Sequence, residues 1–122
     1  MDKAAFPEKR SHKRFIVQEG TFAALRNHDV TLGVIKDISR GGFAVHYVAN
    51  GNLLHGSVMI DCLFKEGHSY LKDVPVKIIS DLEVDDRPLF SSISMRRCGL
   101  QFKEMTPARM SQLERFIENY AL

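Results

Sequence analysis

The sequence predicts a mainly all-β fold, a six-stranded antiparallel β-barrel with a C-terminal α-helix and a flexible N-terminal arm. Three observations predict it. Short apolar stretches recur along the 122 residues, turn-forming residues separate them, and helical periodicity is confined to the C-terminal segment. A chain of this length typically forms one domain and buries roughly two-thirds of the surface that its unfolded form exposes. We therefore expect a single barrel that folds without disulfides.

The chain divides into an arm, residues 1–14, and a barrel with its helix, residues 15–122. The arm has little apolar periodicity and contains Pro7, so we expect it to be flexible. Six alternating or apolar stretches follow. They predict strands at residues 15–25, with an irregularity at Gly20, and at residues 30–36, 43–48, 57–64, 70–79 and 93–103.

The connections between these strands carry the polar and glycine residues that turns require. They are expected at residues 26–29, 37–42, 49–56, 65–68 and 80–92. The last of them is an acidic loop in which Pro88 argues against regular structure. Its apolar residues could form a surface for a partner protein, although a plain connecting loop explains them better.

A C-terminal helix is predicted after the last strand. Thr106 can cap its first turn, and Pro107 suits the first helical position. The apolar residues that follow recur at helical spacing and would lie on one face, which we expect to pack on the barrel. They are Met110, Leu113, Phe116, Ile117 and Tyr120.

Composition excludes several classes of protein. Hydrophobic residues make up 44% and charged residues 26%, and no apolar run is long enough to cross a bilayer. The N-terminus lacks the apolar stretch of a signal peptide, so a cytoplasmic location without membrane association is expected. Cys62 and Cys98 are interpreted as reduced packing residues. The net charge of +2 is too small to indicate a general nucleic-acid binder.

The usual catalytic and metal-binding patterns are absent from the sequence. The five histidines show no H-x-x-x-H spacing and no mixed Cys/His cluster, so no metal is expected. Ser39 lacks the G-x-S-x-G context of a nucleophilic serine, and there is no G-K-S/T run for a nucleoside triphosphate. The sequence therefore predicts neither an enzyme nor a cofactor.

Two polar clusters carry the functional information. Arg10 and Arg14 form an Arg-x-x-x-Arg pattern, and Asp37, Ser39 and Gly42 form Asp-x-Ser-x-x-Gly. Arginine can grip phosphate or the O6/N7 edge of guanine with two parallel hydrogen bonds. An aspartate can accept from guanine N1 and N2, a serine adds a hydroxyl, and a glycine permits positive φ and close backbone approach. The set suits a guanine nucleotide.

Each cluster also has a plainer interpretation. Arg10 and Arg14 could belong to a solvated basic tail, and Asp37 and Ser39 could cap a turn that Gly42 completes. On an extended arm the Cα atoms of the two arginines would lie about 13 Å apart with both side chains on one side, which suits a clamp around a compact ligand. A helical arm would instead give only a basic stripe.

These motifs, in this order, resemble the PilZ domain, a bacterial receptor for cyclic di-GMP. The resemblance covers roughly residues 8–120, because Cys98-Gly99-Leu100-Gln101-Phe102 and the amphipathic helix resemble the family's last strand and closing helix. It implies that both arginines of the first motif bind phosphate and guanine, and that the three residues of the second motif contact the ligand. Lys9 would add a cation and could help to hold a second, stacked nucleotide.

The resemblance implies a cyclic di-GMP receptor or effector that changes conformation on binding and signals to an unidentified protein partner. In this picture the ligand draws the arm onto the barrel. Two alternatives remain open. One is a small β-barrel that binds RNA or single-stranded DNA through its basic arm, and the other is a protein adaptor that needs no ligand.

Overall fold

The computed structural model describes residues 12–50, 53–84 and 93–122. These form eight strands and one helix, and none of the described helical segments is long and apolar enough to span a membrane. The elements are β1 (Phe15–Ile16), β2 (Phe22–Asn27), β3 (Asp29–Ile38), β4 (Gly42–Asn50), β5 (Val58–Lys65), β6 (His68–Tyr70), β7 (Val74–Glu83), β8 (Ile93–Phe102) and α1 (Pro107–Tyr120).

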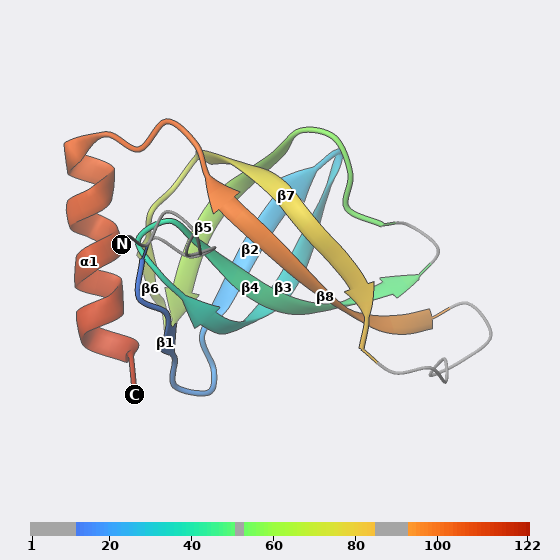
Figure 1. Ribbon diagram of the computed structural model, residues 1–122, viewed down its shortest axis with the longest axis horizontal. Helices are drawn as coiled ribbons and strands as arrows, with labels where there is room; N and C mark the ends of the chain where they lie inside the picture. Colours follow the sequence, from blue (N-terminus) through green and yellow to red (C-terminus); the bar gives the residue numbers. More distant parts are fainter. Residues whose placement is uncertain (1–11, 51–52, 85–92) are drawn as a thin grey trace, which may run out of the picture.

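Six of the strands close into an antiparallel barrel. The pairing order is β3-β2-β5-β7-β8-β4, and β3 pairs with β4 to complete the ring (Figure 1). The two short strands lie outside this ring, with β1 paired to β3 and β6 paired to β5. The predicted fold class, a six-stranded antiparallel barrel with a C-terminal helix, is confirmed. The predicted flexible arm lies almost entirely outside the described residues.

The single strand predicted over residues 15–25, with an irregularity at Gly20, is in fact two strands. The segment forms β1 and β2, which both pair with β3, with Phe15 opposite Ile38 and Phe22 opposite Val34. A turn that includes Gly20, at φ 86°, separates them. Glycine takes such an angle without steric cost, so the predicted irregularity is a turn that divides the segment into two strands, both antiparallel to β3.

The strand predicted over residues 70–79 is also divided. Its first residue, Tyr70, is the last residue of β6, and the next strand, β7, begins at Val74. Leu71 and Asp73, between the two strands, have positive φ angles of 55° and 56°. The side chain of Leu71 is buried, which holds this unusual backbone in place. Strand β7 then continues through Glu83, so the predicted acidic loop begins later than expected, and residues 85–92 of that loop lie outside the described ranges.

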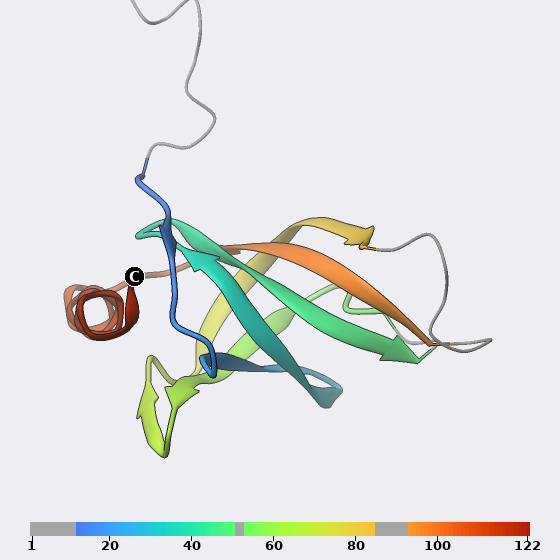
Figure 2. The same cartoon turned by 90° about the horizontal axis from the view of Figure 1, so that it is seen from below.

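Helix α1 stands beside one end of the barrel, next to β1 and β6, and Figure 2 shows it almost end-on. The hydroxyl of Thr106 accepts from Arg109 N at 3.1 Å, as predicted for the cap. Leu113, Phe116 and Ile117 are buried on the core side of the helix. This confirms the predicted apolar face and accounts for the position of the helix.

The C-terminal end of α1 is fastened to the segment that follows Arg14. Gln18 N donates to Tyr120 O at 2.9 Å, and Leu122 N donates to Ile16 O at 2.8 Å. These hydrogen bonds join the first and last described segments of the chain. They fix the course of the backbone from which Arg14 projects.

A polar network lies on the seam between β4, β7 and β8. The hydroxyl of Tyr47 donates to Asp81 Oδ2 at 2.8 Å, and Arg96 Nε donates to Asp81 Oδ1 at 2.8 Å. Burial, followed by the hydrogen bond to Asp81, raises the pKa of Tyr47 to about 12. The phenol therefore keeps its proton, and the network holds these strands together.

Candidate functional site

The second motif surrounds the tight connection between β3 and β4. Contrary to the prediction that residues 37–42 form a turn, Asp37 is part of β3 and Gly42 begins β4. The buried Ser39 hydroxyl accepts from Gly41 N at 3.1 Å and Gly42 N at 3.2 Å, and Ser39 N donates to Gly42 O at 2.8 Å. Ser39 therefore caps the turn, as in the plainer of the two interpretations.

Gly42 is required for the contact between β4 and β8. A Cβ atom there would lie 2.2 Å from Leu100 O and 3.2 Å from Gln101 Cα, both backbone atoms of β8. Its φ is not in the positive range that the sequence led us to expect. The close backbone approach does exist, but it joins two strands of the barrel.

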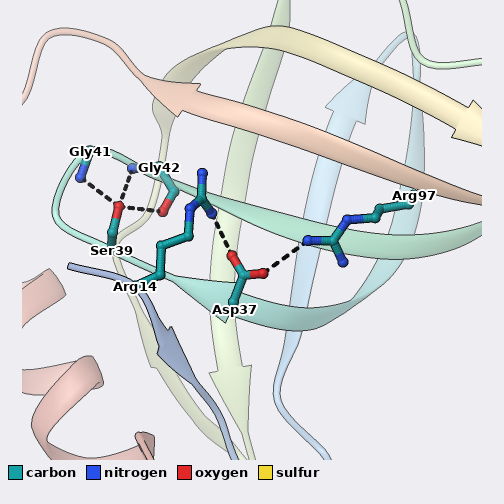
Figure 3. A network of polar contacts seen from close by, with 6 residues as sticks. All are labelled: Arg14, Asp37, Ser39, Gly41, Gly42 and Arg97. Carbon is teal, nitrogen blue, oxygen red and sulfur yellow. Dashed lines mark hydrogen bonds and ion pairs between the residues drawn. The ribbon is translucent and has the colours of Figure 1, made fainter. Parts of the chain in front are cut away.

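An ion-pair chain centres on Asp37 (Figure 3). Arg14 Nη1 lies 2.5 Å from Asp37 Oδ1, and Arg97 Nη2 lies 2.9 Å from Asp37 Oδ2. Exposed fractions are 23% for the Arg14 side chain, 18% for Asp37 and 43% for Arg97. Two cations thus share one half-buried carboxylate, and the group carries a formal charge of +1.

Strand pairing explains how Arg14 reaches Asp37. Arg14 directly precedes β1, in which Phe15 lies opposite Ile38 and Ile16 opposite Asp37. This register brings the end of the arm against the end of β3. Arg14 Nε is buried and has no hydrogen-bond partner among the described residues. An unpaired buried donor costs about 1–3 kcal/mol, so Arg14 has donor capacity that its contact with Asp37 leaves unused.

A pocket of about 330 Å³ lies beside this chain of charges. One part of its wall is polar and comes from the end of the arm and the turn after β3. The other part is largely apolar and comes from β7, β8, the segment leading into α1 and the first turns of α1. The lining residues are His12, Arg14, Ser39, Arg40, Gly41, Gly42, Ile79, Leu100, Gln101, Phe102, Met105 and Met110.

The structure thus brings Arg14, Ser39 and Gly42 of the sequence-predicted set to one pocket, with Asp37 joined to Arg14 at its edge. Asp37 itself does not line the pocket. Lys9 and Arg10, also predicted as ligand-binding residues, lie outside the described residues. Their part in the site stays a prediction.

Several contributors were missed by reasoning from the sequence. Arg97 was read only as part of the last strand, although an arginine pair before the Cys98-Gly99 step was a visible signal. Met105 and Met110 line the pocket, and no sequence motif marks them.

The turn after β3 is also joined to helix α1 by an ion pair, in which Arg40 Nη2 lies 2.6 Å from Glu114 Oε2.

The described residues contain no group of three or more His, Cys, Asp or Glu side chains that could hold a metal ion. The arrangement instead offers cationic donors and an apolar wall. Such a surface can hold a flat, anionic organic ligand.

Comparison with known proteins agrees with the sequence motifs. The PilZ domain family model matches residues 8–119. A solved structure described as the PilZ domain of YcgR from Escherichia coli with c-di-GMP has a TM-score of 0.66. That match has 15% sequence identity and covers 92% of this chain and 91% of the other. No curated protein matches the chain.

The structural match establishes a shared fold, and the family match spans nearly the whole chain. The barrel, the helix and the two motifs occupy the matched residues. The chain therefore belongs to the PilZ domain family.

Proposed function

We propose that this PilZ domain is a receptor for cyclic di-GMP and that the ligand occupies the pocket between Arg14, the turn after β3 and the apolar wall. The observation that carries the proposal is that Arg14, Ser39 and Gly42 line one pocket. The two motifs are far apart in the sequence, since Asp37, the first residue of the second motif, comes 23 positions after Arg14. The family match and the c-di-GMP in the YcgR PilZ structure support the choice of ligand.

The polar side of the pocket suits the phosphates. Arg14 Nε has no hydrogen-bond partner among the described residues, so the guanidinium can donate a further hydrogen bond to a phosphate oxygen or to the O6/N7 edge of guanine. Arg40 and the imidazole of His12 extend this side. We expect Arg10, and Lys9 to a lesser degree, to complete the clamp from the arm.

The apolar side suits the purine bases. Ile79 is an exposed lining residue, and Met105 and Met110 are partly exposed lining residues. Thioethers are polarizable and pack well against aromatic rings. A guanine that lies against this wall would bury its face while its edge remains available to Arg14.

Isothermal titration calorimetry of the purified domain with cyclic di-GMP tests the proposal, with GTP and cyclic di-AMP as controls for guanine and cyclic-dinucleotide specificity. A good bidentate arginine contact is worth about 1–3 kcal/mol, so Arg14→Ala should weaken binding about tenfold or more. Arg10→Ala should do the same if the arm takes part. Saturation at one nucleotide per protein would remove the proposed second, stacked ligand and with it the role of Lys9.

A matched control is Lys77→Ala. Lys77 is an exposed cation on β7 that does not line the pocket, so its loss should change affinity by less than about twofold. The proposal fails if cyclic di-GMP gives no heat at tens of micromolar ligand. It also fails at this location if Arg14→Ala binds as tightly as the wild type.

We further propose that binding draws the arm onto the barrel and that the altered surface signals to a partner protein. Ordering an arm residue costs about 1–2 kcal/mol, so only the sum of several charged contacts can drive this change. Proteolysis of the arm with and without cyclic di-GMP measures it, because an ordered arm is cleaved more slowly. Equal cleavage rates in both states would contradict the proposed ordering.

A further inference from the structure

Arg97 belongs to neither motif, yet it is joined to the site through Asp37. It lies on β8, opposite His46 of β4, and its side chain crosses β4 to reach Asp37 on β3 (Figure 3). Arg97 does not line the pocket. Its contact with the site runs through one carboxylate, at 2.9 Å from Nη2 to Oδ2.

Asp37 holds its two arginines on different oxygens. Arg14 takes Oδ1 and Arg97 takes Oδ2, so the two ion pairs do not compete for one acceptor atom. The carboxylate is largely shielded from water, with 18% of the side chain exposed. A shielded carboxylate that loses its only cation is left with an uncompensated charge, which is strongly unfavourable.

This geometry has a consequence for any ligand that draws on Arg14. If Arg14 were the only partner of Asp37, each contact that moved Arg14 toward a phosphate would leave the carboxylate unpaired. Arg97 remains in place on the other oxygen, so the carboxylate keeps a cationic partner. The energetic penalty for releasing Arg14 is thereby reduced.

We propose that Arg97 is a positioning residue of the binding site, which holds Asp37 in place and lets Arg14 exchange between Asp37 and an anionic ligand. The inference rests on the proposed binding of cyclic di-GMP and assigns Arg97 a role through Asp37, without contact with the nucleotide. Removing Arg97 should leave Asp37 paired with Arg14 alone, so that Arg14 is released less readily and ligand binding weakens.

The test is calorimetric titration of cyclic di-GMP into Arg97→Met, Arg97→Lys, Asp37→Asn and the Arg97→Met/Asp37→Asn double variant, each checked by thermal melting for an intact fold. Arg97→Met should weaken binding about tenfold, and this loss should shrink to less than about twofold in the Asp37→Asn background, because interacting residues give non-additive effects. Arg97→Lys keeps the charge beside Asp37 and should recover most of the affinity.

Lys36→Met is the matched control. Lys36 is an exposed cation next to Asp37 on β3 that forms no ion pair with that carboxylate. The Lys36→Met variant removes the same charge from the same region as Arg97→Met, and its affinity for cyclic di-GMP should stay within about twofold of that of the wild type.

The inference is overturned if Arg97→Met binds like the wild type, if its loss is undiminished in Asp37→Asn, or if Arg97→Lys binds as weakly as Arg97→Met. The lysine comparison decides the matter where Asp37→Asn binds too weakly to titrate. Failure of the proposed function looks different, because the wild-type domain itself would then show no binding.

Discussion

Replacing Gly42 by alanine should break the seam between β4 and β8. The added Cβ would lie 2.2 Å from Leu100 O, whereas ordinary contacts between a carbon and a carbonyl oxygen are about 3.3–3.6 Å. The obstacle is backbone, so it cannot turn away as a side chain would. The strands must separate by about 1 Å at the first of the residue pairs that join them, Gly42 with Gln101.

The expected loss can be estimated from two contributions. Overpacking of this kind costs about 1–3 kcal/mol, and weakening one or two strand hydrogen bonds adds about 0.5–1.5 kcal/mol for each. We expect Gly42→Ala to lower the free energy of unfolding by about 2–4 kcal/mol. For a domain of this size that corresponds to a fall in melting temperature of about 8–16 °C, at about 4 °C for each kcal/mol.

Urea and thermal unfolding followed by circular dichroism measure this effect, and Gly41→Ala is the adjacent control. At Gly41 the nearest described atoms to the added Cβ belong to the exposed His12 imidazole, at 2.7 Å, and that ring can rotate away. The control should lose less than about 0.5 kcal/mol. Equal unfolding midpoints for Gly41→Ala and Gly42→Ala would refute the reasoning that the motif glycine is required by the barrel.

Three further predictions concern residues away from the pocket. Burial and two neighbouring cations lower the pKa of His46 below 6.5 in the folded protein. The stability that neutral His46 contributes is therefore full above pH about 6.5 and is lost as the pH falls through the lowered folded pKa. Between pH about 7.5 and 5.5 the melting temperature of the wild type should fall more than that of His46→Gln, and equal falls would contradict this. Burial raises the pKa of the Cys98 thiol to about 12, so iodoacetamide should modify the partly exposed Cys62 and leave Cys98 unmodified until the protein unfolds, as mass spectrometry can verify. Tyr47→Phe removes the hydrogen bond to Asp81 and should cost about 1–2 kcal/mol in urea unfolding, whereas an unchanged midpoint would show that the bond contributes nothing.

Most of the architecture followed from local patterns. The capped start of α1 at Thr106 and Pro107 was predicted correctly, and so were its buried apolar face and the strand that ends at Phe102. These features depend on capping chemistry and on the period of apolar residues, which neighbouring positions define by themselves. The breaks within residues 15–25 and 70–79 were not resolved, because an apolar stretch has the same appearance whether it pairs with one strand or two.

The candidate site likewise has parts that local sequence patterns predicted and parts that they did not. Arg14 and the Asp37-to-Gly42 motif were identified from residue type, spacing and family resemblance, while the roles of Ser39 in the turn and Gly42 in the seam became apparent only from their neighbours. Contact between Arg14 and Asp37 depends on the pairing of β1 with β3. No local pattern specifies that pairing.

The sequence by itself determined that this chain forms a β-barrel with a closing helix and carries the Arg-x-x-x-Arg and Asp-x-Ser-x-x-Gly motifs. Only the tertiary structure decided that Asp37 is shared by Arg14 and Arg97, and that Met105 and Met110 face the same pocket as the turn. The physical reason is the distance along the chain over which each kind of interaction acts. Propensity, capping and turn chemistry act between near neighbours along the chain, whereas these contacts exist because closure of the barrel brings β3, β4 and β8 side by side.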